Sequence, residues 1–262
     1  MDIIVCVKHV PETADADLKI DPSGKSIETA GLVFDINEWD DYALEEAVRI
    51  KEKEGGKVTA ITIGSQDSES TLRKCLARGA DSAIRLTDPR FEGSDAYAIA
   101  KILHSVIKTL HYDLIFTGMQ AADDGNAVVG PVLAEMLGVP HVTLVKKIEL
   151  SSGFAKVSRE LEAGLEEQIE VNLPSLFSIQ TGINEPRYVS IMGIRKAMQK
   201  EIKVMSLVDT GLTENDVGLA GSWLNTESVY MPQFEKQAVF LKGTDDEIAM
   251  KIVEILKSRG LI

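Results

Sequence analysis

The amino-acid sequence predicts an α/β fold built on a doubly wound, mostly parallel β-sheet. In the first half of the chain, short runs rich in Val and Ile alternate with longer stretches whose apolar residues recur every three or four positions. Such alternation is typical of strands joined by crossover helices that cover both faces of a parallel sheet. After Gly138 the alternation gives way to consecutive extended segments, which predict extra β structure beside the parallel core.

The elements of the first half follow from these patterns. Continuous apolar runs bounded by turn residues indicate strands that are buried on both faces. The clearest helix carries Ala43, Leu44 and Ala47 on one side and Glu and Lys on the other, and Gly55-Gly56 ends it. The predicted strands are 2–7, 58–64, 82–86 and 113–118, and the predicted helices are 40–54, 68–78, 95–110 and 126–137.

The second half combines extended segments with a stretch of weak periodicity. Residues 204–243 show little pattern, and a stretch of this length usually packs on another surface or forms an arm. We therefore assign an α/β domain to residues 1–203 and a C-terminal arm with a final helix to residues 204–262. The predicted strands here are 142–148, 154–161, 168–173 and 175–179, and the final helix is 245–259.

Composition limits the partners of the chain. With 28 Lys and Arg against 41 Asp and Glu, the net charge of −13 argues against binding to nucleic acid or to anionic lipid. Two cysteines and the absence of a signal peptide favour a reducing, cytoplasmic setting. No apolar run is long enough for a membrane span.

The loop after the strand 113–118 is the first candidate binding site. Ligands of open parallel sheets bind beyond the carboxyl ends of the strands. Here the chain passes from Gly118 through small and turn-forming residues into a helix predicted to begin near Asn126, and a helix N-terminus suits a phosphate. Gly125 and Ala127 would allow close approach of the backbone. The alternative is an ordinary capped turn, with Asp124 or Asn126 as the cap.

Catalytic and metal-binding patterns are missing from the sequence. It has no Walker loop, no G-x-G-x-x-G after the first strand and no G-x-S-x-G elbow. The four histidines lack metal-ligand spacing, and Cys6 and Cys75 fall within predicted core elements. Before the first long helix, Asp40 is predicted to act as its cap, with Trp39 stacking on an adenine as the alternative. We therefore predict a binder or carrier without a catalytic or metal site.

These segments together resemble one family, the small (beta) subunit of electron transfer flavoproteins. The resemblance extends over nearly the whole chain and is most specific in Asn184-Glu185-Pro186-Arg187-Tyr188. It also includes residues 7–11, 37–47, 118–131 and 160–166.

The resemblance implies a heterodimer with an alpha subunit that holds the redox-active FAD, on a Rossmann-like, adenine-nucleotide-binding fold. The small subunit would hold AMP or, in electron-bifurcating members, a second FAD; Asp123-Asp124-Gly125-Asn126 matches neither loop type fully, so both remain open. The implied cofactor-binding residues are Cys6, Asn37, Glu38, Trp39, Asp40, Ile63, Gly118, Gln120, Ala121, Asp123, Asp124, Gly125, Asn126, Ala127, Val128 and Val129.

The resemblance also implies a recognition segment, residues 184–203, that docks flavin-dependent dehydrogenases of the acyl-CoA type. In it Ile191 matches an aliphatic side chain that inserts into the partner, while the alternative is an amphipathic helix lying on the protein's own core. Residues 204–243 would wrap the alpha subunit. The implied partner-binding residues are Glu160, Tyr188, Ile191, Met192, Ile194 and Lys196, with Lys200 and Lys203 adding charge for steering.

The resemblance implies an electron carrier that transfers electrons from the dehydrogenase to a downstream acceptor, with NADH-dependent bifurcation as an option. The competing class is a freestanding ATP- or AMP-binding stress-type sensor or enzyme of similar fold. The missing phosphate-grip motif and the long C-terminal region argue against that class.

Overall fold

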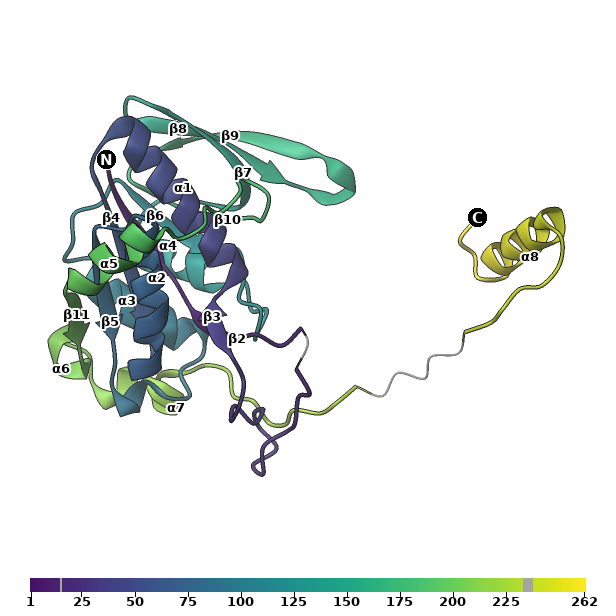
Figure 1. Ribbon diagram of the computed structural model, residues 1–262, viewed down its shortest axis with the longest axis horizontal. Helices are drawn as coiled ribbons and strands as arrows, with labels where there is room; N and C mark the ends of the chain where they lie inside the picture. Colours follow the sequence, from purple (N-terminus) through teal and green to yellow (C-terminus); the bar gives the residue numbers. More distant parts are fainter. Residues whose placement is uncertain (15, 233–237) are drawn as a thin grey trace.

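A mostly parallel nine-stranded sheet forms the body of the protein, in a computed structural model that describes residues 1–14, 16–232 and 238–262 (Figure 1). The strand order is β11-β5-β4-β1-β6-β10-β7-β8-β9, parallel from β11 to β7 and antiparallel from β7 to β9. The predicted fold class is confirmed. The strands are β1 (Asp2–Cys6), β2 (His9–Pro11), β3 (Phe34–Ile36), β4 (Lys57–Ile63), β5 (Ser82–Leu86), β6 (Leu114–Gly118), β7 (His141–Ser151), β8 (Phe154–Glu160), β9 (Glu166–Asn172), β10 (Ser175–Ile179) and β11 (Ile202–Met205).

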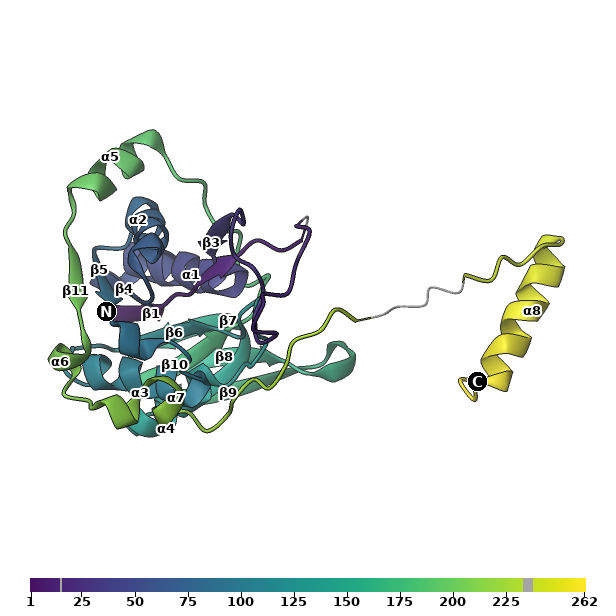
Figure 2. The same cartoon turned by 90° about the horizontal axis from the view of Figure 1, so that it is seen from below.

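Helices cover both faces of the parallel part, as the alternating sequence predicts (Figure 2). Alternate residues of β1 point to opposite sides, so Ile3 and Val5 pack against α1 and α2, while Ile4 packs against α3 and α4. The helices are α1 (Glu38–Glu54), α2 (Glu69–Arg78), α3 (Ala96–Ile107), α4 (Val129–Leu137), α5 (Ile191–Gln199), α6 (Leu207–Thr210), α7 (Gly218–Gly221) and α8 (Asp245–Ser258).

The winding places a switch in strand order beside β1. The chain moves from β1 to β4 and β5 on one side and then returns to β6 on the other. Where the order reverses, the loops that follow β1 and β6 separate and leave room for a ligand. The sheet thus has its expected binding position at the carboxyl ends of β1, β4 and β6.

Several elements differ from their predicted bounds. The helix predicted over 126–137 begins at Val129, and the helix predicted over 40–54 begins at Glu38. The short antiparallel pair β2–β3 was not predicted, because each of its strands has only three residues and carries no clear period. Strand β11 runs across the predicted division at residues 203 and 204, and the division itself stays a prediction.

The C-terminal region first follows the body and then leaves it. Trp223 stacks on Tyr97 of α3 with ring centroids 3.9 Å apart, which holds the chain beside α3. Figure 1 shows α8 apart from the α/β body, and within the described ranges none of its side chains is buried. No described helix combines the length and the apolar character that crossing a bilayer requires.

Candidate functional site

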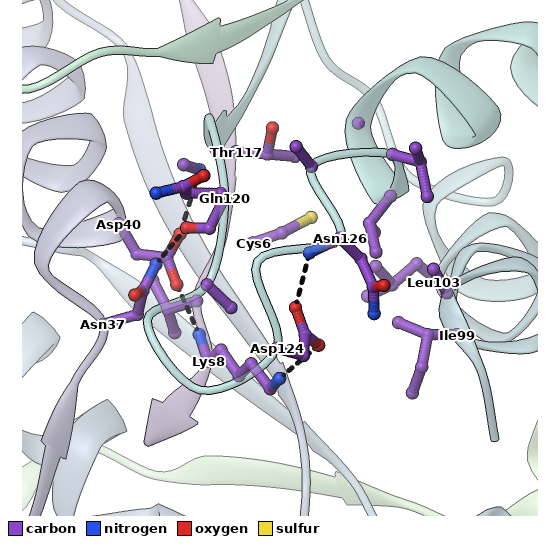
Figure 3. Close-up of a pocket in the computed structure, with 18 of the residues that line it drawn as sticks. Cys6, Lys8, Asn37, Asp40, Ile99, Leu103, Thr117, Gln120, Asp124 and Asn126 are labelled. Carbon is purple, nitrogen blue, oxygen red and sulfur yellow. Dashed lines mark hydrogen bonds and ion pairs between the residues drawn. The ribbon is translucent and has the colours of Figure 1, made fainter. Parts of the chain in front are cut away.

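A cavity of about 230 Å³ opens at the carboxyl ends of β1, β4 and β6, at the switch in strand order (Figure 3). Its walls differ in polarity. Figure 3 shows Asn37 and Asp40 on one side and Ile99 and Leu103 of α3 on the other. A cavity with one polar and one apolar wall suits a ligand that has a flat apolar part and a polar part.

The loop between β6 and α4 forms the floor of the polar part. Helix α4 begins after Val128, whose side chain cannot cap it, and the backbone N–H groups of Ala127 to Gly130 have no acceptor among the described residues. Unpaired amides at a helix N-terminus attract an anion. Ala127 has a φ of 56°, a left-handed conformation that is uncommon for a residue with a side chain and occurs mainly at functional sites.

The alternative of a capped turn was wrong for this loop. Neither Asp124 nor Asn126 lies at the cap position of α4. The Asp124 carboxylate instead accepts the N–H of Asn126 at 3.0 Å, two residues along, and so closes a local turn.

Asp40 is a buried carboxylate that joins three segments, and its predicted role as a helix cap was wrong. It accepts the N–H of Lys8 at 2.7 Å and the N–H of Gly118 at 2.9 Å, while Asn37 occupies the cap position of α1. Burial raises the pKa of Asp40 to about 7, and the two N–H donors oppose this rise because they favour the carboxylate. The same burial, with the nearby Asp40 charge, raises the pKa of the Cys6 thiol, which stays protonated.

Gly118 is required at this junction because its backbone lies too close to Trp39 and Asp40 for a side chain to fit. A Cβ atom at this position would overlap the Asp40 carboxylate and would lie 2.7 Å from the Cβ of Trp39. Asn37 adds a second tie to the same loop, because its Nδ2 donates to the carbonyl of Gln120 at 2.8 Å and its Oδ1 accepts the N–H of Ala122 at 3.0 Å. The N-terminal end of α1 therefore holds the β6–α4 loop in place.

Lys8 lies at the mouth of the cavity and was missed as a site residue. Its Nζ donates to Asp123 at 2.6 Å and to Asp124 at 2.8 Å. Partial burial lowers the pKa of Lys8, but the hydrogen bonds to the two aspartates outweigh it and the pKa is raised. A lone lysine directly after the first strand was the available signal, since this position lies at the carboxyl edge of the sheet.

Most of the predicted cofactor residues meet at this cavity. Trp39 does not line it; its Nε1 donates to Gln180 at 3.0 Å, on the side of the antiparallel strands. Glu38, Asp123 and Gly125 also lie outside the lining. The predicted residues that line the cavity are Cys6, Asn37, Asp40, Ile63, Gly118, Gln120, Ala121, Asp124, Asn126, Ala127, Val128 and Val129, and those not predicted include Lys8, Ile99, Leu103, Thr117 and Gly130.

The recognition segment lies away from the cavity, and it exposes several apolar side chains. It forms the helix α5, but the expectation that its apolar side would lie on the protein's own core was wrong: of α5, only Ala197 is buried in the described ranges. The Nζ of Lys200 donates to the carbonyl of Ala80 at 2.6 Å, and its contribution to steering stays a prediction. The exposed apolar side chains are Tyr188, Ile191, Met192, Ile194 and Met198, and Lys196 is exposed beside them.

Glu160 is held by Gln180, the residue directly after β10. Its carboxylate accepts Nε2 of Gln180 at 3.1 Å and lies 3.8 Å from Nζ of Lys146. The neighbouring Arg159 pairs with Glu167, with its Nε 3.6 Å from the carboxylate. Glu160 thus lies in the same polar chain as Trp39, through Gln180.

The fold and the cavity define a class: an open-sheet α/β protein with a ligand cavity at its switch point. Comparison with known proteins gives the family. The model of the electron transfer flavoprotein domain family matches residues 25–210.

Relatives match over almost the whole chain. The electron transfer flavoprotein subunit beta of Thermoanaerobacterium thermosaccharolyticum is 42% identical, with 100% of both chains covered. That of Methylophilus methylotrophus is 39% identical, with 98% of each chain covered. The caffeyl-CoA reductase-Etf complex subunit CarD of Acetobacterium woodii is 36% identical, with 100% of both chains covered. The chain belongs to the electron transfer flavoprotein family, as a small (beta) subunit.

Proposed function

We propose that the chain holds an adenine nucleotide in the cavity at β1, β4 and β6, within a heterodimer whose alpha subunit carries the redox-active FAD. The observation that carries this proposal is the row of backbone N–H groups from Ala127 to Gly130, which line the cavity and have no acceptor among the described residues. Phosphate oxygens are the ligand that such a row of amides at a helix N-terminus suits best.

The rest of the cavity fits the other end of a nucleotide. Ile99 and Leu103 offer an apolar wall for a flat base, and Asn37 and Gln120 offer amide groups at the opposite wall. Gly130 supports a close fit behind the phosphate position, since a Cβ there would lie 2.8 Å from Oγ1 of Thr117. The adenine nucleotide proposed here is either AMP or the adenine half of a second FAD, and the nucleotide released from the heterodimer decides between them.

The electron-transfer role rests on the family to which the chain belongs. Flavin supplies one- and two-electron chemistry when bound, and the residues of this chain position and shield groups. Cys6 is a protonated, buried thiol, and Asp40 is engaged by two backbone donors. Such groups hold structure in place, which suits a carrier subunit.

Docking of a dehydrogenase at the recognition segment is the second part of the proposal. Ile191 is 75% exposed, and Met192, Ile194 and Tyr188 are exposed beside it. These apolar side chains face solvent while the rest of the segment is bonded to the α/β body. Such an arrangement suits insertion into a partner's pocket. Lys196 adds positive charge at its edge, so a flavin-dependent dehydrogenase with an acidic rim is the partner expected here.

The test is to denature the purified heterodimer and to quantify the nucleotides released. One FAD together with one further adenine nucleotide per heterodimer, either AMP or a second FAD, is expected. Release of two FAD molecules would show that the cavity holds a second flavin in place of AMP. Release of one FAD and no further adenine nucleotide would contradict the assignment of the cavity.

A further inference from the structure

Charged hydrogen bonds fix the recognition segment where it leaves the body. The Arg187 guanidinium donates to Glu45 at 2.8 and 3.0 Å and to Glu52 at 2.6 and 3.0 Å. The backbone N–H of Arg187 also donates to Glu45, at 3.1 Å. Both glutamates belong to α1, and Glu45 is buried while Glu52 is exposed. Paired bonds between a guanidinium and carboxylates are strong and fix direction as well as distance.

Asn184 ties the same segment to α1 a second time. Its Nδ2 donates to the Glu46 carboxylate at 3.0 Å and to the carbonyl of Tyr42 at 3.2 Å. Asn184 and Arg187 thus hold the chain on either side of Pro186. Directly after them, Tyr188 is fully exposed. The point at which the chain turns outward is therefore set by α1.

The far end of the segment is fixed to a different helix, α2. Arg73 of α2 donates to the carbonyls of Ala197 at 2.7 Å and of Lys200, at the C-terminal end of α5. Lys200 in turn donates to the carbonyl of Ala80, just after α2. Gly193 lies so close to α2 that a Cβ there would overlap the carbonyl of Ala77. Figure 2 shows α5 lying beside α2 on the outer side of the sheet.

From this arrangement we infer that Arg187 is a positioning residue for partner docking: gripped by Glu45 and Glu52, it sets the direction in which Ile191 faces the dehydrogenase. The inference rests on the proposed docking function of the recognition segment. A surface that is already fixed loses less conformational freedom when a partner binds, so its affinity is higher for the same contacts. Removing the grip releases residues 188–190, which connect Arg187 to α5, and leaves α5 attached to α2 through Gly193 and Arg73.

The experiment compares variants of the purified heterodimer. Arg187→Gln removes the forked bonds, Arg187→Lys keeps the charge without the fork, and Arg195→Gln removes the same charge from an exposed α5 position that makes no ion pair with the described residues. The first readout is hydrogen exchange of residues 188–194 in the free heterodimer. The second is KM and kcat with an acyl-CoA dehydrogenase that reduces the unmodified heterodimer.

Arg187→Gln is expected to speed exchange and to raise KM roughly three- to tenfold, the factor for releasing an ordered segment, with kcat unchanged. Arg187→Lys is expected to restore part of both effects, and Arg195→Gln to leave exchange unchanged. Glu52→Gln keeps the buried Glu45 pair and provides a milder test should Arg187→Gln fail to fold; it is expected to change exchange and KM in the same direction by a smaller factor.

A double variant with Ile191→Ala separates the two proposals. If Arg187 acts through Ile191, the double variant raises KM by less than the product of the single effects. If Ile191→Ala raises KM but Arg187→Gln changes neither KM nor exchange, or does no more than Arg195→Gln, docking stands and the positioning role is overturned. If Ile191→Ala leaves KM unchanged, the docking function is overturned, and the positioning role with it.

Discussion

The cavity and the recognition segment both depend on contacts with α1. The cavity presents polar groups to its proposed ligand, whereas the recognition segment presents apolar side chains to solvent. At the N-terminal end of α1, Asn37 and Asp40 turn polar groups toward a cavity and hold the β6–α4 loop. Along its side, Glu45 and Glu52 hold the recognition segment from below, and the apolar side chains face outward. At the cavity, where a small charged ligand is proposed to bind, the polar groups line an enclosed space. At the recognition segment, where a protein is proposed to bind, the polar groups lie between α1 and the segment, and the apolar side chains face solvent. The direction of the apolar side chains distinguishes the two kinds of site.

The largest expected effect breaks the cavity side alone. Gly118→Val places a branched side chain where even a Cβ would overlap Asp40, so we expect a loss of at least about 3 kcal/mol of stability and loss of the bound nucleotide. Nucleotide content and urea denaturation of the heterodimer measure this. The matched control is Gly153→Val, at a hairpin turn where a Cβ would meet nothing, although its φ of 83° adds local strain. Normal nucleotide content in Gly118→Val would contradict the close approach.

The next largest effect is expected from a substitution that disrupts the recognition segment and leaves the cavity intact. Ile191→Ala removes most of a side chain expected to be buried by the partner, and burial of such a side chain contributes about 1.5–3 kcal/mol, so KM for the dehydrogenase rises roughly 10- to 100-fold. Nucleotide content is expected to remain the same. Val208→Ala on α6 is the control, since Val208 is 78% exposed, against 75% for Ile191. Equal effects of the two substitutions would show that the segment has no special role.

A smaller effect is expected in the pH dependence of stability, and it tests the cavity side of the comparison. Asp40 keeps its proton up to a pKa of about 7 in the folded state, while in the unfolded chain it titrates near pH 4. Between these values the folded state holds the extra proton, so the free energy of unfolding falls as pH rises from about 4 to about 7. Asp40→Asn is expected to remove this fall, at most about 1.4 kcal/mol per pH unit.

Denaturation of the heterodimer at several pH values between 4.5 and 7 measures the slope. The control is Asp209→Asn, because the backbone hydrogen bond from Ser206 and the Ser206 hydroxyl lower the pKa of Asp209 below its usual range, outside this window. A slope that is the same in Asp40→Asn and the unmodified protein would show that Asp40 is ionised throughout.

The sequence was sufficient for features that depend on local pattern. Continuous apolar runs predicted the parallel strands except β11, and the position of the cavity followed from the carboxyl ends of β1, β4 and β6. Asp40 was misinterpreted because an aspartate before a helix is usually its cap. Its real donors, the N–H groups of Lys8 and Gly118, are 32 and 78 residues distant along the chain, and only the folded sheet brings them together.

The recognition segment shows the same limit in another form. A helix was expected here only in the alternative that laid it on the protein's own core, and apolar spacing alone does not say which way a helix faces. The direction is decided by Arg73, Arg187 and Gly193, which attach the polar and small positions of the segment to α1 and α2. The outward direction therefore depends on contacts between residues more than 100 positions apart, which no local pattern contains.

The attachment of α5 through its backbone and its polar side has a consequence for how such a protein changes over generations. Ile191, Met192, Ile194 and Met198 are exposed over half or more of their surface, so exchanging them costs little stability, typically within about 0.5 kcal/mol for exposed positions. If a dehydrogenase docks here as proposed, preference for one dehydrogenase over another is adjustable by substitutions at these four positions, with the proposed nucleotide cavity left unchanged.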